Sequence, residues 1–172
     1  EHQQRAALQQ QQIAERWPRP KWLKGKLNFG FTGASGSGKS SLINRILELQ
    51  CDDARAAETD VVECTKEPTP YSAPAAVLGG VEATLWDLPG VGTERCPRDS
   101  YIQRMGLRYF NGLVILSAAR LTEIDVMLFR EALVWEIPCY VVRSKADNDI
   151  RSNSKRQVAP EQTVANVLRD LH

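Results

Sequence analysis

Histidine and paired cysteines are scarce in this sequence, and their scarcity argues against two kinds of site. The two histidines, His2 and His172, stand near the chain ends, which disfavours a histidine-based metal or catalytic centre. None of the four cysteines forms a C-x-x-C pair, so zinc-binding and thioredoxin-like motifs are excluded. Reduced thiols in the cytosol are the expected state of these cysteines.

The sequence also lacks long apolar runs and a strong net charge. No apolar run reaches the roughly 18 residues that a transmembrane helix needs, so no membrane-spanning helix is predicted. The formal net charge is +1, which gives no electrostatic argument for nucleic acid as a partner. With 172 residues, the chain can bury the core of one domain.

The most informative segment that is present is the glycine-rich stretch at residues 33–40, which fits the phosphate-binding pattern G-x-x-x-x-G-K-[ST]. Residues 26–32 before it are predicted to form a buried strand, and residues 41–49 after it an amphipathic helix. In this setting backbone N–H groups and the helix dipole attract phosphate oxygens. A glycine- and serine-rich linker that fits by chance is the alternative, and the strand–loop–helix context weakens it.

Two side chains of this loop carry the predicted chemistry. Lys39 is expected to contact the β- and γ-phosphates of a nucleotide, and the Ser40 hydroxyl is expected to bind Mg²⁺. The residues predicted to contact the nucleotide here are Gly33, Ser35, Gly36, Ser37, Gly38, Lys39, Ser40 and Ser41.

A second motif indicates which base is bound. Ser144-Lys-Ala-Asp147 follows a predicted strand at residues 137–142 and fits the [NT]-K-x-D pattern of GTPases, with serine in first place. The Asp147 carboxylate can accept two hydrogen bonds from guanine, a pair that adenine cannot offer, and the stem of Lys145 can lie along the base. The motif predicts GTP or GDP as the ligand. A strand-end turn with exposed charges is the alternative.

A third motif lies between the other two. Asp87-Leu-Pro-Gly90 follows a predicted strand at residues 81–86 and fits the pattern D-x-x-G. Asp87 is expected to hold Mg²⁺ through water, and the Gly90 amide is expected to meet the γ-phosphate, where a Cβ would crowd the approach. A plain turn is the alternative. Three motifs in order, each after a predicted strand, fit the ligand edge of an open α/β sheet.

The order of predicted elements indicates an α/β fold: a P-loop GTPase-like three-layer sandwich with a mainly parallel sheet, expected to lack its last strand and helix. Residues 51–79 are expected to form a switch loop rather than regular structure. Residues 1–25 are interpreted as an N-terminal helical segment and linker, and residues 26–172 as a C-terminally incomplete GTPase domain. Further predicted elements are helices at 98–110, 122–136 and 158–171 and a strand at 113–116.

Two longer segments resemble the immunity-related (interferon-inducible) GTPase family: Thr59-Asp-Val-Val-Glu63-Cys-Thr65 and Leu85-Trp-Asp-Leu-Pro-Gly-Val-Gly-Thr93. The likeness covers roughly residues 26–150. It implies binding of GTP and GDP with Mg²⁺, slow hydrolysis, a GTP-dependent homodimer across the nucleotide face, and a cytoplasmic protein that contacts intracellular membranes peripherally. Two positions depart from the family pattern, since Asp60 replaces the usual glycine and Ser144 the usual threonine.

The residue after D-x-x-G predicts slow intrinsic hydrolysis. Ras-like GTPases place a water-orienting glutamine there, whereas this chain has Val91. Ser35 would crowd an incoming arginine finger, so a second copy of the chain is expected to complete the site. The resemblance singles out Glu63 as catalytic, with an exposed switch-loop carboxylate as the alternative. Thr59 and Thr65 could each offer Mg²⁺ a hydroxyl, and Thr65 joins Lys39 and Glu63 as an expected catalytic residue.

Three alternatives remain open from the sequence. The chain could be a nucleotide-dependent binding module with negligible hydrolysis, because Val91 replaces the water-orienting glutamine. It could be an ATP-using P-loop protein, which Asp147 argues against. The basic segment at residues 151–156 is interpreted as a solvated loop, with contact to anionic lipid as the alternative.

Overall fold

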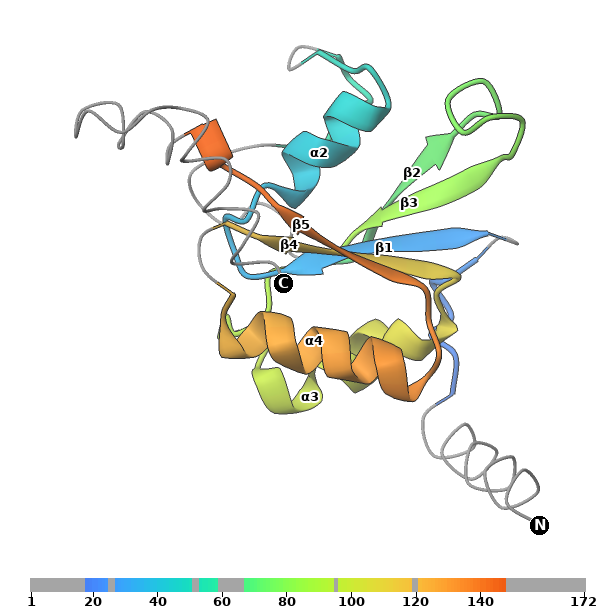
Figure 1. Ribbon diagram of the computed structural model, residues 1–172. Helices are drawn as coiled ribbons and strands as arrows, with labels where there is room; N and C mark the ends of the chain where they lie inside the picture. The colour runs from blue at the N-terminus through green and yellow to red at the C-terminus, as the bar shows by residue number, and fades with distance from the viewer. Residues whose placement is uncertain are drawn as a thin grey trace, which may run out of the picture.

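The computed structural model describes residues 18–24, 27–50, 53–58, 67–94, 96–118 and 121–147, and Figure 1 shows their arrangement. The strands are β1 (Asn28–Gly33), β2 (Thr69–Ala73), β3 (Ala83–Asp87), β4 (Gly112–Ser117) and β5 (Cys139–Arg143). The helices are α2 (Lys39–Ile46), α3 (Arg98–Met105) and α4 (Glu123–Val134), with a 3-10 turn, η1, at Leu107–Tyr109.

The described strands form one sheet in the order β2-β3-β1-β4-β5. Only β2 runs antiparallel to its neighbour, β3, and the other three pairings are parallel. Parallel neighbours need helical crossovers, and α2, α3 and α4 supply them along the chain. The mainly parallel α/β sheet predicted from the sequence is therefore confirmed.

Helices cover both faces of the sheet, with α2 on one side and α3 and α4 on the other (Figure 1). Successive side chains of a strand point to opposite faces, so Leu85 packs in the cluster around Ile43 of α2, whereas its neighbour Trp86 packs in the cluster around Leu128 of α4. Helix α4 begins at a capping box: the Thr122 side chain accepts a hydrogen bond from the Asp125 amide, and the Asp125 side chain accepts one from the Thr122 amide. The three-layer arrangement follows from this alternation.

Two sequence predictions about regular structure are wrong. Residues 69–73, expected within an irregular loop, form strand β2. Pro70 discouraged that prediction, but an outermost strand tolerates a residue without an N–H donor, and Pro70 lies opposite Trp86 in the ladder. The helix predicted over 98–110 ends at Met105, because Gly106 adopts a left-handed φ of 57° and the chain continues as η1.

The predicted helix at 158–171 and the N-terminal helical segment lie outside the described residues. Within the part of the chain that the structure describes, no helix combines the length and apolar character needed to cross a bilayer.

Candidate nucleotide-binding site

The fold brings the three sequence motifs to one edge of the sheet. Strand β1 ends at Gly33, β3 ends at Asp87, and β5 ends at Arg143, one residue before Ser144. These strands run parallel within the same sheet, so their carboxyl ends meet at a single edge, where open α/β sheets bind ligands. Each motif lies at the position that its preceding strand predicts.

The loop at residues 33–38 has the backbone geometry of a phosphate cradle. Gly33 has φ of 141°, and a Cβ there would lie 2.3 Å from the Leu116 carbonyl oxygen, so only glycine fits. Gly38 precedes α2 with φ of 91°, and no side chain caps this helix. The N–H groups of the first helical turn therefore remain available to a phosphate anion.

Lys39 and Ser40 start α2 and turn toward neighbouring parts of the site. The Lys39 side chain is buried, and its Nζ donates to the Ala34 carbonyl 3.1 Å away, so it folds back over the loop. The Ser40 hydroxyl donates to Asp87 Oδ2 at 2.5 Å. Asp87 is 1% exposed, and a buried carboxylate beside a hydroxyl is a pair of hard oxygen donors that suits Mg²⁺. The residues present therefore fit the metal that the sequence implies.

The D-x-x-G turn lies directly against the phosphate loop. A Cβ added to Gly90 would stand 2.6 Å from Ser35 Cα and 2.7 Å from its nitrogen, so the turn can approach only because residue 90 is glycine. The Val91 amide donates to the Gly33 carbonyl at 3.1 Å. The Val91 side chain is 3% exposed and belongs to the core beside α3 and α4, so it cannot orient an attacking water.

The base motif is tied to the phosphate loop through its first residue. Ser144 Oγ donates to the Ser37 carbonyl at 2.5 Å, and the Ser144 amide donates to the Ser117 carbonyl at 2.9 Å. A Cβ on Gly38 would lie 3.8 Å from Ser144 Cβ, which confirms that the two loops are in contact. The sequence predicted Ser144 as the first residue of the guanine motif, but did not predict its hydrogen bond to the phosphate loop.

The remaining residues of the base motif face solvent. Lys145 has a left-handed φ of 56°, which is uncommon for a residue other than glycine, and both Lys145 and Asp147 are exposed. Asp147 lies four residues after the end of β5, and an exposed carboxylate there can receive a planar base. Ser35, Gly36 and Ser41 are exposed at the same loop, whereas Ser37 is buried.

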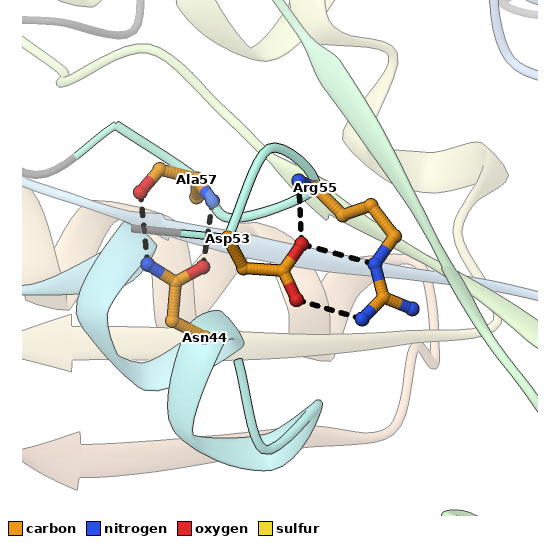
Figure 2. Close-up of polar contacts among 4 residues, drawn as sticks. All are labelled: Asn44, Asp53, Arg55 and Ala57. Carbon is orange, nitrogen blue, oxygen red and sulfur yellow. Dashed lines mark hydrogen bonds and ion pairs between the residues drawn. The ribbon is translucent and has the colours of Figure 1, made fainter. Parts of the chain in front are cut away.

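Asn44 is a positioning residue that sequence reasoning missed. Its amide pairs with the backbone of Ala57, donating from Nδ2 to the carbonyl at 2.8 Å and accepting from the amide at 2.6 Å (Figure 2). Ala57 lies two residues before Thr59, and Asn44 lies one helical turn after Ser40 on α2. The clamp therefore anchors Ala57, within the predicted switch loop, on the helix that carries the predicted Mg²⁺ ligand.

An ion pair stands beside this clamp. Arg55 Nη2 lies 2.7 Å from Asp53 Oδ2, and both the side chain and the backbone amide of Arg55 donate to Asp53 Oδ1 (Figure 2). These hydrogen bonds lower the pKa of Asp53 to about 2. The turn between α2 and Ala57 is thus closed by local contacts.

Three predicted site residues cannot be placed. Thr59, Glu63 and Thr65 lie outside the described residues. Their expected roles in Mg²⁺ binding and catalysis stay predictions.

The fold and the arrangement of these loops define the class: this is a P-loop domain of the GTPase type. The structure resembles that of a bacterial selenocysteine-specific elongation factor, EF-Sec, with a TM-score of 0.56 over 86% of this chain and 23% of that chain. The two sequences are 17% identical, so this likeness concerns the fold alone.

The chain belongs to the interferon-inducible GTPase family, because the model of that family (IIGP) matches residues 21–171. It is 39% identical to interferon-inducible GTPase 5 of Bos taurus over 125 residues, which are 73% of this chain and 26% of that protein. It is 34% identical to interferon-inducible GTPase 1 of Mus musculus over 128 residues, 74% of this chain and 30% of that protein. The chain thus spans between a quarter and a third of these relatives' length.

Proposed function

We propose that this chain binds guanine nucleotides with Mg²⁺ and hydrolyses GTP to GDP and phosphate. The observation that carries the proposal is the 2.5 Å hydrogen bond from Ser144 Oγ to the Ser37 carbonyl, since it joins the base motif to the phosphate loop. A nucleotide whose phosphates occupy the loop at residues 33–40 would therefore extend its base toward Asp147. Membership of the interferon-inducible GTPase family supports the same ligand.

Each described residue has a distinct role in this proposal. Lys39 would exchange its bond to the Ala34 carbonyl for the β- and γ-phosphates, and uncapped N–H groups at the start of α2 would bind the same oxygens. Ser40 and Asp87 would hold Mg²⁺, which would neutralise charge that develops on the phosphates during hydrolysis. Asp147 would accept two hydrogen bonds from guanine, and Lys145 would lie along the base.

The proposed hydrolysis is slow in a single copy and faster in a homodimer. Val91 is buried in the core and offers no side chain to the attacking water. Ser35, exposed beside Gly90, narrows the path of an arginine finger. A second copy across the nucleotide face would complete the site, with Glu63 near the partner's nucleotide, because positioning and electrostatics carry most of phosphoryl-transfer catalysis.

Nucleotide choice tests the first part of the proposal. Isothermal titration in Mg²⁺ buffer with GDP, a non-hydrolysable GTP analogue, ADP and an ATP analogue is expected to show binding of the guanine pair alone. Asp147→Asn should shift preference toward xanthine nucleotides, since xanthine presents the reversed hydrogen-bonding pair. Asp53→Asn, an exchange of the same chemistry outside the site, is the matched control. Equal affinity for GTP and ATP analogues in the wild-type protein would refute the guanine assignment.

Dimer activation is tested by turnover at saturating GTP over a hundredfold range of protein concentration. Specific activity is expected to rise with concentration, and Glu63→Ala should flatten the rise. Constant specific activity would contradict the dimer mechanism. Negligible turnover at every concentration, together with tight GTP binding, would favour the second candidate, a nucleotide-dependent binding module, which the buried Val91 side chain supports.

Peripheral contact with intracellular membranes, and the cytoplasmic location that accompanies it, stay predictions. The basic segment at residues 151–156 lies outside the described residues. Co-sedimentation of the protein with vesicles containing anionic lipid, with and without GTP, is the measurement that decides the membrane contact.

A further inference from the structure

One buried hydroxyl group connects the phosphate-loop strand to the D-x-x-G turn. Tyr101 of α3 is 0% exposed, and its phenol oxygen lies 3.0 Å from Thr32 Oγ1 and 2.9 Å from the Pro89 carbonyl oxygen. A carbonyl can only accept, so the phenol O–H donates to Pro89, and the Thr32 hydroxyl donates to the phenol oxygen. Thr32 is also fully buried, so the chain Thr32–Tyr101–Pro89 is shielded from water.

The bond to Pro89 constrains Gly90 directly. The Pro89 carbonyl and the Gly90 N–H belong to one planar peptide unit and point in opposite directions across it. A hydrogen bond that holds the carbonyl toward Tyr101 therefore sets the direction of the Gly90 N–H. Gly90 is further confined by Ser35, since an added Cβ would stand 2.6 Å from Ser35 Cα.

We propose that Tyr101 is a positioning residue that sets the direction of the Gly90 N–H toward the γ-phosphate. This inference rests on the proposed function and on the sequence prediction that the Gly90 amide meets that phosphate. Tyr101 is fully buried, so it would act on the phosphate through the Pro89–Gly90 peptide. Burial raises the pKa of Tyr101, so the phenol stays protonated and keeps its donor at every working pH.

The position of Tyr101 on α3 gives the contact a second consequence. Helix α3 starts at Arg98, eight residues after Gly90, and Tyr101 and Met105, one turn apart, both pack in the core beside α4. A displacement of the Pro89–Gly90 peptide by the γ-phosphate would therefore pull on a core side chain of α3. The same hydroxyl that orients the amide would transmit its movement to the helix.

A purely structural tyrosine would behave differently from a positioning one. If the hydroxyl only stabilised the core, its loss would lower stability and would affect GDP and GTP binding alike. If it orients Gly90, its loss must weaken the ligand that carries a γ-phosphate and spare the one that does not. The ratio of GTP-analogue affinity to GDP affinity separates the two roles.

The test is Tyr101→Phe in the full chain, which keeps the ring and removes the hydroxyl. We expect affinity for a non-hydrolysable GTP analogue to fall about 5- to 20-fold, as the loss of one buried hydrogen bond predicts, and affinity for GDP to change less than about twofold. Tyr109→Phe, on the adjacent η1 and only half-buried, is the matched control and should leave both affinities unchanged. Titration calorimetry gives both constants, and circular dichroism confirms folding.

Each outcome of this test decides one question. An equal fall in both affinities, or no fall in either, would overturn the positioning role and leave the proposed function standing. Failure of the wild-type protein to bind guanine nucleotides would refute the proposed function instead. If Tyr101→Phe does not fold, Thr32→Val is tested instead, because it removes the hydroxyl that holds the phenol to β1. It should lower the ratio of GTP-analogue affinity to GDP affinity at least about twofold. An unchanged ratio would overturn the inference.

Discussion

Replacing Asn44 by alanine is expected to destabilise the protein more than any ordinary surface exchange on its helices. The two hydrogen bonds between the Asn44 side chain and the Ala57 backbone measure 2.8 and 2.6 Å, and the two residues are 7% and 3% exposed. Alanine removes both bonds and leaves the N–H and C=O of Ala57 buried without partners. This is the costly kind of hydrogen-bond loss, because both groups stay shielded from bulk water.

The magnitude follows from the two orphaned groups. Each buried, unsatisfied backbone group costs about 1–3 kcal/mol. Water that enters the space left by the Asn44 amide would recover part of this cost. The free energy of unfolding should therefore fall by about 2–4 kcal/mol. Against a total stability of about 5–15 kcal/mol for a domain, that is a large fraction. For a chain of this size each kcal/mol lowers Tm by about 2–4 °C, so Tm should fall by about 4–16 °C.

Urea unfolding followed by tryptophan fluorescence and circular dichroism measures the loss. Gln103→Ala on α3 is the matched control, since it removes an exposed helix amide and should change stability by less than about 0.5 kcal/mol. A loss for Asn44→Ala as small as that of the control would refute the reasoning, because it would show that Ala57 is hydrated once the amide is gone or that the clamp is not formed in solution.

Gly90→Ala should weaken GDP as well as GTP, because its Cβ would stand 2.6 Å from Ser35 Cα and displace the phosphate loop itself. Gly36→Ala is the contrasting variant, because its Cβ meets no atom within 4 Å. It should lower the stability of the fold by only the roughly 1 kcal/mol that a left-handed alanine costs. Equal nucleotide affinities for the two variants would contradict the steric argument. Arg55→Ala should raise the pKa of Asp53 from about 2 toward 3.8 in an NMR titration. Since the folded pKa is the lower one, the pair stabilises the fold above pH about 4 and loses its effect as pH falls toward 2.

The sequence predicted where the three motifs lie in the sheet, because the motifs are local and the strands end where the motifs begin. A glycine-rich turn after a buried strand needs no tertiary information to be recognised. Parallel strands then bring Gly33, Asp87 and Ser144 to one edge, and the contact from Ser40 to Asp87 follows from that topology. The approach of Gly90 to the γ-phosphate stays a prediction, and the structure shows that Gly90 lies close to Ser35 of the phosphate loop.

The features that escaped prediction depend on partners distant in the chain or on local backbone choice. Tyr101 and Asn44 bond backbone carbonyls that lie 12 and 13 residues away, and no periodicity marks such a pairing. Strand β2 contains Pro70, which looks like a strand breaker until its place at the edge of the described sheet is known. Gly106 fits inside a helical pattern but adopts a left-handed φ that ends α3.

Ser144 shows how a departure from a family pattern can be understood from geometry. The resemblance leads one to expect threonine there, and serine differs from threonine only by a methyl group. The hydroxyl is the part that acts in this structure, since it donates to the Ser37 carbonyl across 107 residues of sequence. The bond links two loops that also approach each other at Gly38. Because serine keeps the donor, the departure preserves the link between the phosphate loop and the base motif, and it leaves the proposed recognition of guanine by Asp147 unaffected.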